Sequence, residues 1–251
     1  MAEAVAGTDA GVDIFLLQLG KQLPGAEVLG WLSTEEQEAA RQFSREELRH
    51  RYLQVRAAVR SCLAAASGLS PERLDIRRDT SGKPWLHDSD LHFNLSHCGD
   101  RLAIAIRQHQ PLGIDLERTS HRRSWRAIAE RYFHVAETAA LAQAGAGDFF
   151  RLWCLKEAFF KATGGGIASG LDRARFEVSP PLIRHRLDPM LGEPDANWRF
   201  FLWQAGDNDH LALALPGTGT GTDRIRLHYP LLPAITGVAA TPPRLELLAA
   251  T

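Results

Sequence analysis

Asp115 and Glu117 have a spacing in this 251-residue chain that suits metal chemistry. They lie two residues apart in a segment with the pattern of a short strand, so both carboxylates project from one face while Ile114 and Leu116 point into a core. Two such carboxylates repel each other unless a cation lies between them. Mg²⁺ is commonly held by one or two carboxylates together with phosphate and water oxygens. The alternative is an exposed strand end whose acids pair with nearby arginines.

A second group of charges lies on a predicted helix at residues 152–163. Glu157 and Lys161 are four residues apart and share a face, and Lys156 precedes Glu157. Of the 29 basic residues, 25 are arginines and only four are lysines, so a lysine in this chain indicates a place where a compact ammonium group is preferred. The alternative is an exposed ion pair, which contributes only ~0.2–0.5 kcal/mol.

Three further elements carry groups that can bind anions. One is a turn that presents a lysine, one is a strand end with a hydroxyl and an imidazole, and one is an arginine-rich helix. Each also has a local interpretation, namely a hairpin lysine, a turn that stabilises its own backbone and a solvated basic face. A serine and a histidine that are neighbours on a strand point to opposite faces, which argues against a nucleophile–base pair. The elements are Ser81-Gly82-Lys83-Pro84, Asn94-Leu95-Ser96-His97, and Arg49, Arg51, Arg56 and Arg60.

The surrounding sequence predicts the elements that position these groups. Capping-box sequences at Ser33 and Ser44 each predict the start of a helix, and Gly68 is expected to end the second one. A further helix is predicted over 125–142, and the helix at 152–163 ends at three glycines. Alternating apolar residues predict strands, which we place at 12–19, 91–95, 102–106, 112–116, 174–178, 198–204 and 211–215.

A weak internal repeat suggests the architecture. Residues 100–106 resemble residues 209–215, and residues 12–14 resemble residues 114–116 at a similar offset. Chance similarity between short apolar strands is the alternative. The pattern predicts an α+β fold of two similar halves, with an N-terminal half at 1–110 and a C-terminal half at 111–216. Residues 217–251 are expected to form a flexible linker, rich in Gly and Thr, and a tail.

Composition excludes several classes of protein. A hydrophobic content of 45% and a net charge of −1 exclude a disordered chain and a basic nucleic-acid coat. No apolar run approaches the ~20 residues of a membrane span, and residues 1–11 lack the basic cluster of a signal peptide. The cysteines are odd in number and have no metal-ligand spacing, so we expect reduced thiols in a soluble cytoplasmic protein. They are Cys62, Cys98 and Cys154.

Taken in order, four motifs resemble one family of enzymes. Gly82-Lys83-Pro84, Phe93-Asn94-Leu95-Ser96-His97, Gly113-Ile114-Asp115-Leu116-Glu117 and the segment from Trp153 to Lys161 together resemble a 4′-phosphopantetheinyl transferase of the long, surfactin-synthetase-activating (Sfp) type. The motifs span about 80 residues and the arginine-rich helix extends the match to residue 49. Each motif is degenerate alone, but four in order are specific.

The resemblance implies a fold and an activity. It implies two α+β halves related by a pseudo-twofold axis, with coenzyme A in the cleft between them. Such an enzyme transfers the 4′-phosphopantetheine arm from coenzyme A to a serine hydroxyl of an apo acyl- or peptidyl-carrier protein and releases adenosine 3′,5′-bisphosphate. It implies Mg²⁺, or Mn²⁺ in its place, as cofactor, and a monomer with no nucleic-acid or membrane partner. Residues 131–141 resemble the family's carrier-docking region.

The resemblance also assigns roles to residues. It implies that the metal is held by three carboxylates, those of Asp115, Glu117 and Glu157, and that Glu157 takes the serine proton directly or through a water. It implies that Lys156 and Lys161 neutralise the transferring and leaving phosphates. The remaining substrate contacts that it implies are Arg51, Arg56, Lys83, Pro84, Ser96 and His97.

Two departures from the family pattern and two rival functions stay open. Cys98 stands where many relatives have a second serine, which costs one hydrogen bond to the nucleotide, and Gly165 stands where some carry a basic residue. A non-catalytic module that grips a carrier protein or coenzyme A is one rival, although all three carboxylates are present. A hydrolase acting on a nucleotide pyrophosphate is the other.

Overall fold

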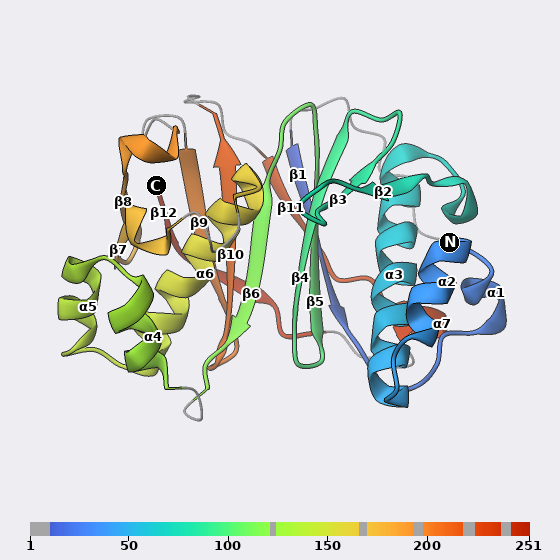
Figure 1. The fold of residues 1–251 in the computed structure, drawn as a ribbon, viewed down its shortest axis with the longest axis horizontal. Coiled ribbons are helices and arrows are strands. Elements are labelled where there is room, and N and C mark those ends of the chain that lie inside the picture. The colour runs from blue at the N-terminus through green and yellow to red at the C-terminus, as the bar shows by residue number, and fades with distance from the viewer. Residues whose placement is uncertain (1–10, 121–123, 166–169, 193–197, 218–223, 237–241) are drawn as a thin grey trace. The chain divides into compact units, whose positions relative to one another are not determined.

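The computed structural model of the chain describes residues 11–120, 124–165, 170–192, 198–217, 224–236 and 242–251 (Figure 1). These residues gather into two compact units. The first comprises the described parts of Met1–Phe93, Gly99–His109 and Asp223–Pro242, and the second those of Asn94–Cys98, Gln110–Thr222 and Pro243–Thr251. Each unit combines helices with β-sheet, which confirms the predicted α+β class.

The first unit is built on three adjacent strands in the order β11-β1-β5. Strand β1 runs antiparallel to β5 and parallel to β11, and the long helix α3 packs against β5. A short hairpin, β2–β3, carries the predicted Gly82 turn. The strands are β1 (Gly11–Gln18), β2 (Ile76–Arg78), β3 (Pro84–Leu86), β5 (Arg101–Gln108) and β11 (Arg224–His228); the helices are α1 (Ala26–Leu29), α2 (Thr34–Arg41), α3 (Glu46–Ser67), the 3₁₀ turn η1 (Pro71–Arg73) and α7 (Pro233–Thr236). Strand β4 (Leu91–Cys98) begins in the first unit, and its residues Asn94–Cys98 belong to the second.

The two capping boxes predicted in the first unit have different outcomes. Ser33 caps α2 as predicted, because its hydroxyl accepts from the Glu36 N–H while the Glu36 carboxylate accepts from the Ser33 N–H. The box predicted at Ser44 is wrong, since α3 begins one residue later with Arg45 at the N-cap and no side-chain cap. The predicted end of α3 at Gly68 is confirmed by its left-handed φ of 74°.

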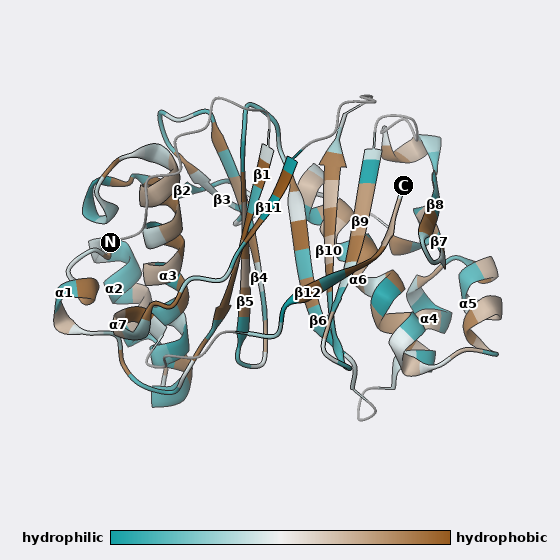
Figure 2. Cartoon of the chain, turned by 180° about the vertical axis from the view of Figure 1, so that it is seen from behind, coloured by the Kyte–Doolittle hydropathy of each residue, from teal (hydrophilic) through white to brown (hydrophobic). Residues whose placement is uncertain are grey.

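The second unit is built on a six-stranded sheet in the order β6-β10-β9-β12-β8-β7, with helix α6 against β6 and β10. Strand β10 is buried along nearly its whole length and is coloured as a predominantly apolar strand in Figure 2. The strands are β6 (Gly113–Arg118), β7 (Ala174–Ser179), β8 (Leu182–Leu187), β9 (Trp198–Ala205), β10 (Asp209–Pro216) and β12 (Leu245–Ala250); the helices are α4 (Trp125–Tyr132), α5 (Val135–Leu141), α6 (Ala146–Thr163) and the 3₁₀ turns η3 (Leu171–Arg173) and η4 (Pro189–Leu191).

The helix predicted over residues 125–142 is two helices, α4 and α5. The chain breaks at His134, whose ring accepts from the Ala136 N–H and whose backbone N–H donates to the Glu137 carboxylate. Histidine is an uncommon cap, so the sequence carried no familiar signal for this break. Helix α6 begins at Ala146, six residues earlier than predicted, and ends at Gly164 with a φ of 79°, as expected.

The segments of the sequence repeat occupy matching places within their own units. Strand β5 pairs antiparallel with β1 in the first unit, and β10 pairs antiparallel with β6 in the second. The tail is more structured than predicted: β11 joins the first sheet and β12 the second. The predicted linker lies mostly outside the described residues, at 218–222.

Two expectations from the sequence concern the cysteines and membrane-spanning helices. Cys62, Cys98 and Cys154 are all free thiols, as predicted. Within the described part of the chain, none of the helices has the length and apolar character needed to cross a membrane.

Candidate functional site

Two of the three predicted carboxylates, those of Asp115 and Glu157, lie near Lys161 in the second unit, where β6 and α6 meet. Gly113 makes this contact close: a Cβ at this position would lie 1.9 Å from the Ala158 carbonyl oxygen and 2.5 Å from the Ala162 nitrogen. The strand carries Asp115 two residues later, and the helix carries Lys161 beside Ala162. Close backbone approach therefore places the acid and the base within reach of each other.

Asp115 is the centre of this cluster, and its side chain is 5% exposed. Its Oδ1 accepts from the Lys161 ammonium at 2.6 Å and from the Ser96 hydroxyl at 2.9 Å. Lys161 also donates to Ser96 Oγ at 3.1 Å and to the Ile114 carbonyl at 3.3 Å. The other carboxylate oxygen, Asp115 Oδ2, is buried and has no hydrogen-bond partner among the described residues.

Glu157 is the second carboxylate of the cluster, half-buried on α6. The pKa of Glu157 is raised to about 7, mainly by burial and next by the charge of Asp115, with a smaller contribution from Glu117, while Lys161 opposes the shift. Its Oε1 is buried without a hydrogen-bond partner in the part of the chain that the structure describes. A carboxyl group with a pKa near 7 can exchange a proton at physiological pH.

The donor set of this cluster suits a divalent cation. Asp115 Oδ2 and Glu157 Oε1 are unpaired buried carboxylate oxygens, and the charge of Glu117 acts on the same site. A hard cation takes such oxygens and completes its shell with phosphate and water. Over the described residues, however, no group of three or more His, Cys, Asp or Glu side chains is arranged to hold a metal. The cluster can therefore supply one or two ligands to a metal ion, but not a complete coordination shell.

The structure corrects the role predicted for Lys156. Its ammonium is completely buried, pairs with Glu137 at 2.8 Å, and donates to the carbonyl oxygens of Leu171 and Ala174. Burial lowers the pKa of Lys156, and the charge of Glu137 opposes that shift. The Lys156 side chain is 0% exposed, so no phosphate can reach its ammonium, whereas the Lys161 side chain is 28% exposed. Its position joins α6 to α5, η3 and β7.

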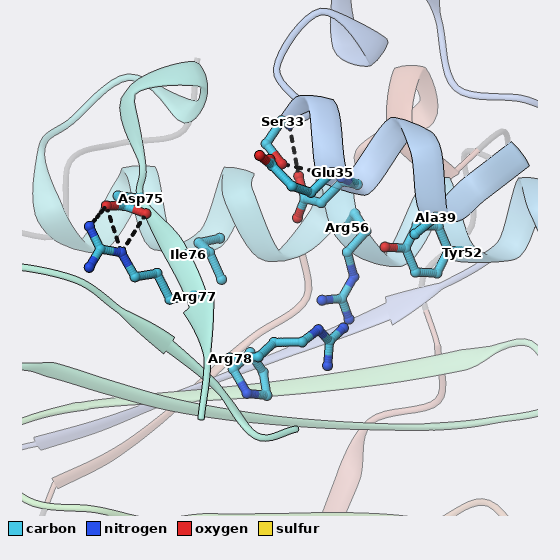
Figure 3. Close-up of a pocket in the computed structure, with 11 residues that line it drawn as sticks. Ser33, Glu35, Ala39, Tyr52, Arg56, Asp75, Ile76, Arg77 and Arg78 are labelled. Atoms are coloured by element: carbon cyan, nitrogen blue, oxygen red, sulfur yellow. Dashed lines mark hydrogen bonds and ion pairs between the residues drawn. The ribbon is translucent and has the colours of Figure 1, made fainter. Parts of the chain in front are cut away.

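The first unit holds a pocket of about 460 Å³ beside α3 (Figure 3). The guanidinium groups of Arg56 and Arg78 face each other in it, and Tyr52 and Pro84 also line it. Burial lowers the pKa of Arg56, and the like charge of Arg78 adds to the shift. The Nε of Arg56 is buried without a partner among the described residues. Two guanidinium groups held together in this way favour an anion between them.

Of the three acids that line this pocket, Glu36 and Asp75 pair with arginines, and the third is Glu35. Glu36 pairs with Arg60 at 2.7 Å and Asp75 pairs with Arg77 at 2.7 Å. The Arg78 guanidinium donates a hydrogen bond to the Gly82 carbonyl oxygen. Once these two pairs are set aside, the two guanidinium groups of Arg56 and Arg78 outnumber the one remaining carboxylate, that of Glu35.

Sequence reasoning found part of this pocket and missed part of it. Arg56 and Pro84 line it as the predicted substrate contacts, whereas Arg51 and Lys83 are not among the residues that line it. Arg51 has a buried Nη1 without a partner among the described residues, and burial lowers the pKa of Lys83. Arg78 was missed because nothing in its local sequence distinguishes it from other surface arginines.

Ser96 and His97 point to opposite faces, as their adjacency on a strand predicts. Ser96 is buried beside Asp115, whereas His97 is exposed. The structure therefore supports the argument against a nucleophile–base pair.

Comparison with known proteins agrees with the resemblance read from the sequence. Residues 111–215 match the family model of the 4′-phosphopantetheinyl transferase superfamily, and residues 26–109 match that of the 4′-phosphopantetheinyl transferase N-terminal region.

Individual relatives carry the same description. The chain is 31% identical to the 4′-phosphopantetheinyl transferase HetI of Nostoc sp. strain PCC 7120, over 75% of this chain and 80% of that protein. It is 29% identical to the phosphopantetheinyl transferase of Thraustochytrium sp., over 73% of this chain and 70% of that protein. It is 36% identical to the 4′-phosphopantetheinyl transferase Sfp of Bacillus subtilis strain 168, over 57% of this chain and 65% of that protein.

Proposed function

Because the chain belongs to the 4′-phosphopantetheinyl transferase superfamily, we propose that it moves the phosphopantetheine arm of coenzyme A onto a carrier protein. The acceptor is a serine hydroxyl of an apo acyl- or peptidyl-carrier protein, and the leaving product is adenosine 3′,5′-bisphosphate. The reaction uses Mg²⁺, or Mn²⁺ in its place.

The observation that carries this proposal is the cluster of Asp115, Glu157 and Lys161. It combines two unpaired buried carboxylate oxygens with an ammonium group at 2.6 Å from Asp115. Transfer of a phosphoryl group requires in-line positioning and positive charge at the phosphate oxygens, and little covalent chemistry from the protein. The cluster provides a fixed positive charge, the Lys161 ammonium, and carboxylate oxygens at which a cation can bind.

Each residue of the cluster has a distinct task in this proposal. Asp115 and Glu157, with Glu117 beside them, hold the cation, which when bound polarises the pyrophosphate. Lys161 neutralises charge that develops on the phosphate oxygens. Glu157 takes the proton of the attacking serine directly or through a water, a step that contributes about 10²–10⁴-fold when the base is well placed.

We assign the phosphoadenosine end of coenzyme A to basic residues of the first unit. Arg56 and Arg78 supply paired guanidinium groups to an anion in their pocket, which suits a terminal phosphate. Pro84 lines the same pocket. Arg51, Lys83 and His97 are further contacts that the family resemblance implies at this end. Since one chain carries every residue in the proposal, we also propose a monomer.

The proposal is tested by incubating the protein with coenzyme A, Mg²⁺ and several apo carrier proteins, and recording the intact mass of each carrier. We expect a gain of one phosphopantetheinyl group in at least one carrier. Chelation by EDTA, Asp115→Ala and Glu157→Gln should each abolish that gain. Glu130→Gln, the same chemical change at an exposed carboxylate on α4, is the matched control and should transfer at the wild-type rate.

Three other outcomes contradict the proposal. No mass gain with any carrier, alongside measurable coenzyme A binding, would indicate a binding module without turnover. Release of phosphopantetheine without an acceptor would indicate hydrolysis. Undiminished transfer by Asp115→Ala would show that the cluster is not the reaction site.

A further inference from the structure

The segment Asn94–Cys98 runs beside β6 and contacts it with side chains rather than with a backbone ladder. Strand β6 is the edge of the six-stranded sheet, so its outward N–H groups need other partners. Asn94 Oδ1 accepts from the Ile114 N–H at 3.0 Å, and the Cys98 thiol accepts from the Arg118 N–H. Side chains of one strand face thus hold this edge at two points.

Ser96 is the middle residue of that face, because residues 94, 96 and 98 alternate with outward-pointing neighbours. It is 8% exposed, and its hydroxyl donates to Asp115 Oδ1 at 2.9 Å while accepting from the Lys161 ammonium at 3.1 Å. The single hydroxyl proton is therefore used on Asp115. The hydroxyl oxygen accepts from Lys161, so both of these hydrogen bonds lie within the cluster.

From this geometry we infer that Ser96 is a positioning residue that orients Asp115 toward a divalent cation. The inference rests on the proposed function. Oδ1 of Asp115 is held by Ser96 and Lys161, and this fixes the plane of the carboxylate. Oδ2, which is buried and has no partner among the described residues, is then the oxygen presented to the cation. Groups that orient a metal ligand in this way commonly change metal affinity by about 10–100-fold when removed.

This role differs from a direct contact with substrate, and the two make opposite predictions. A nucleotide contact at Ser96 would weaken binding of adenosine 3′,5′-bisphosphate in the absence of metal. An orienting contact would leave that binding unchanged and weaken binding of the metal. Asn94 supports the second interpretation, since its bond to Ile114 fixes the backbone immediately before Asp115.

The experiment measures the two affinities separately on the full chain. Binding of Mn²⁺ is followed by electron paramagnetic resonance, and binding of adenosine 3′,5′-bisphosphate in EDTA is followed by calorimetry. We expect Ser96→Ala to weaken Mn²⁺ binding by about 10–100-fold and to leave the nucleotide affinity within about twofold. Ser96→Thr, which retains the hydroxyl, should recover most of the Mn²⁺ affinity. Ser61→Ala on α3 is the matched control, and a thermal melt verifies that each variant folds.

The opposite pattern would overturn the inference. Unchanged Mn²⁺ affinity with a nucleotide affinity lowered tenfold or more would make Ser96 a substrate contact. Failure of wild-type protein to bind Mn²⁺ would also overturn it, because no cation would need orienting. The carrier-protein assay is independent of both measurements: wild-type protein that binds Mn²⁺ but modifies no carrier would refute the proposed function and leave the orienting role intact.

Discussion

Gly113→Ala tests whether the close approach of β6 and α6 builds the site. The added Cβ would lie 1.9 Å from the Ala158 carbonyl oxygen and 2.5 Å from the Ala162 nitrogen. Both are backbone atoms, so no side chain can rotate to make room. Strand and helix must separate by about 1.5 Å to bring the 1.9 Å contact to an ordinary distance.

The expected magnitude follows from that displacement. Forcing one extra carbon into a packed interior typically costs ~1–3 kcal/mol, and here the rigid backbone places the cost at the upper end, about 3 kcal/mol. The atoms that move carry the site: Asp115 is two residues from the glycine, and Glu157 and Lys161 precede the two alanines that collide with it. A misplacement of about 1 Å can reduce catalysis ~10²-fold. We therefore expect the rate of transfer to fall about 100-fold in the protein that remains folded.

The assay combines urea unfolding with initial rates of carrier modification at a temperature where the variant is folded. Gly147→Ala is the matched control, since Gly147 lies on the same helix with no atom within 4 Å of its added Cβ. That change should stabilise the protein by about 0.4–1 kcal/mol and leave the rate unchanged. A Gly113→Ala variant with wild-type stability and rate would refute the reasoning that backbone proximity creates the site.

Three further predictions concern buried titratable groups. The pKa of Glu157 is raised to about 7, so the folded protein binds a proton that the unfolded chain has already lost at neutral pH. The free energy of unfolding in EDTA should therefore fall by about 1–2 kcal/mol between pH 4.5 and 7.5, a figure reduced to allow for the partial exposure of Glu157. Glu157→Gln should remove that fall and abolish transfer. The pKa of His210 is lowered to about 4, chiefly by burial. The free energy of unfolding should therefore decrease by about 2–3 kcal/mol as the pH falls from 6.5 toward 4. In urea titrations, His210→Gln should make this decrease smaller. Lys156→Met should cost about 3–5 kcal/mol of stability by leaving Glu137 buried and without its counter-ion. Lys161→Met should lower the transfer rate and cost less stability, because the Lys161 side chain is 28% exposed and water can replace it beside Asp115. Equal stability losses in the two variants would contradict the separate roles.

The parts of the site that the sequence predicted are those whose residue types carry the chemistry. Asp115 was found because it and Glu117 lie two apart on a strand, where two carboxylates repel each other unless a cation lies between them. Glu157 was found because it shares a helix face with Lys161. The strands around them were found from apolar alternation. The structure brings Asp115, Glu157 and Lys161 together as that reasoning requires.

The parts that it missed depend on contacts between distant segments. Arg78 becomes distinctive only because the hairpin turns it toward Arg56 on α3. Strands β11 and β12 lie in a tail with many prolines, and each is specified by the strand it pairs with rather than by its own pattern. Pairing of this kind is a tertiary property that short-range periodicity does not encode.

Lys156 shows why residue type and spacing are insufficient on a helix that is buried around most of its circumference. Helix α6 is covered on several sides, so its apolar pattern did not reveal which face each lysine occupies. Successive residues of a helix point about 100° apart, and Lys156 and Glu157 therefore cannot share one direction. The bond from Lys156 to Glu137 fixes the rotation of α6, and that rotation determines where Glu157 and Lys161 point. Lys156 thus contributes to the geometry of Glu157 and Lys161, the two residues of this helix that we propose act on the substrate.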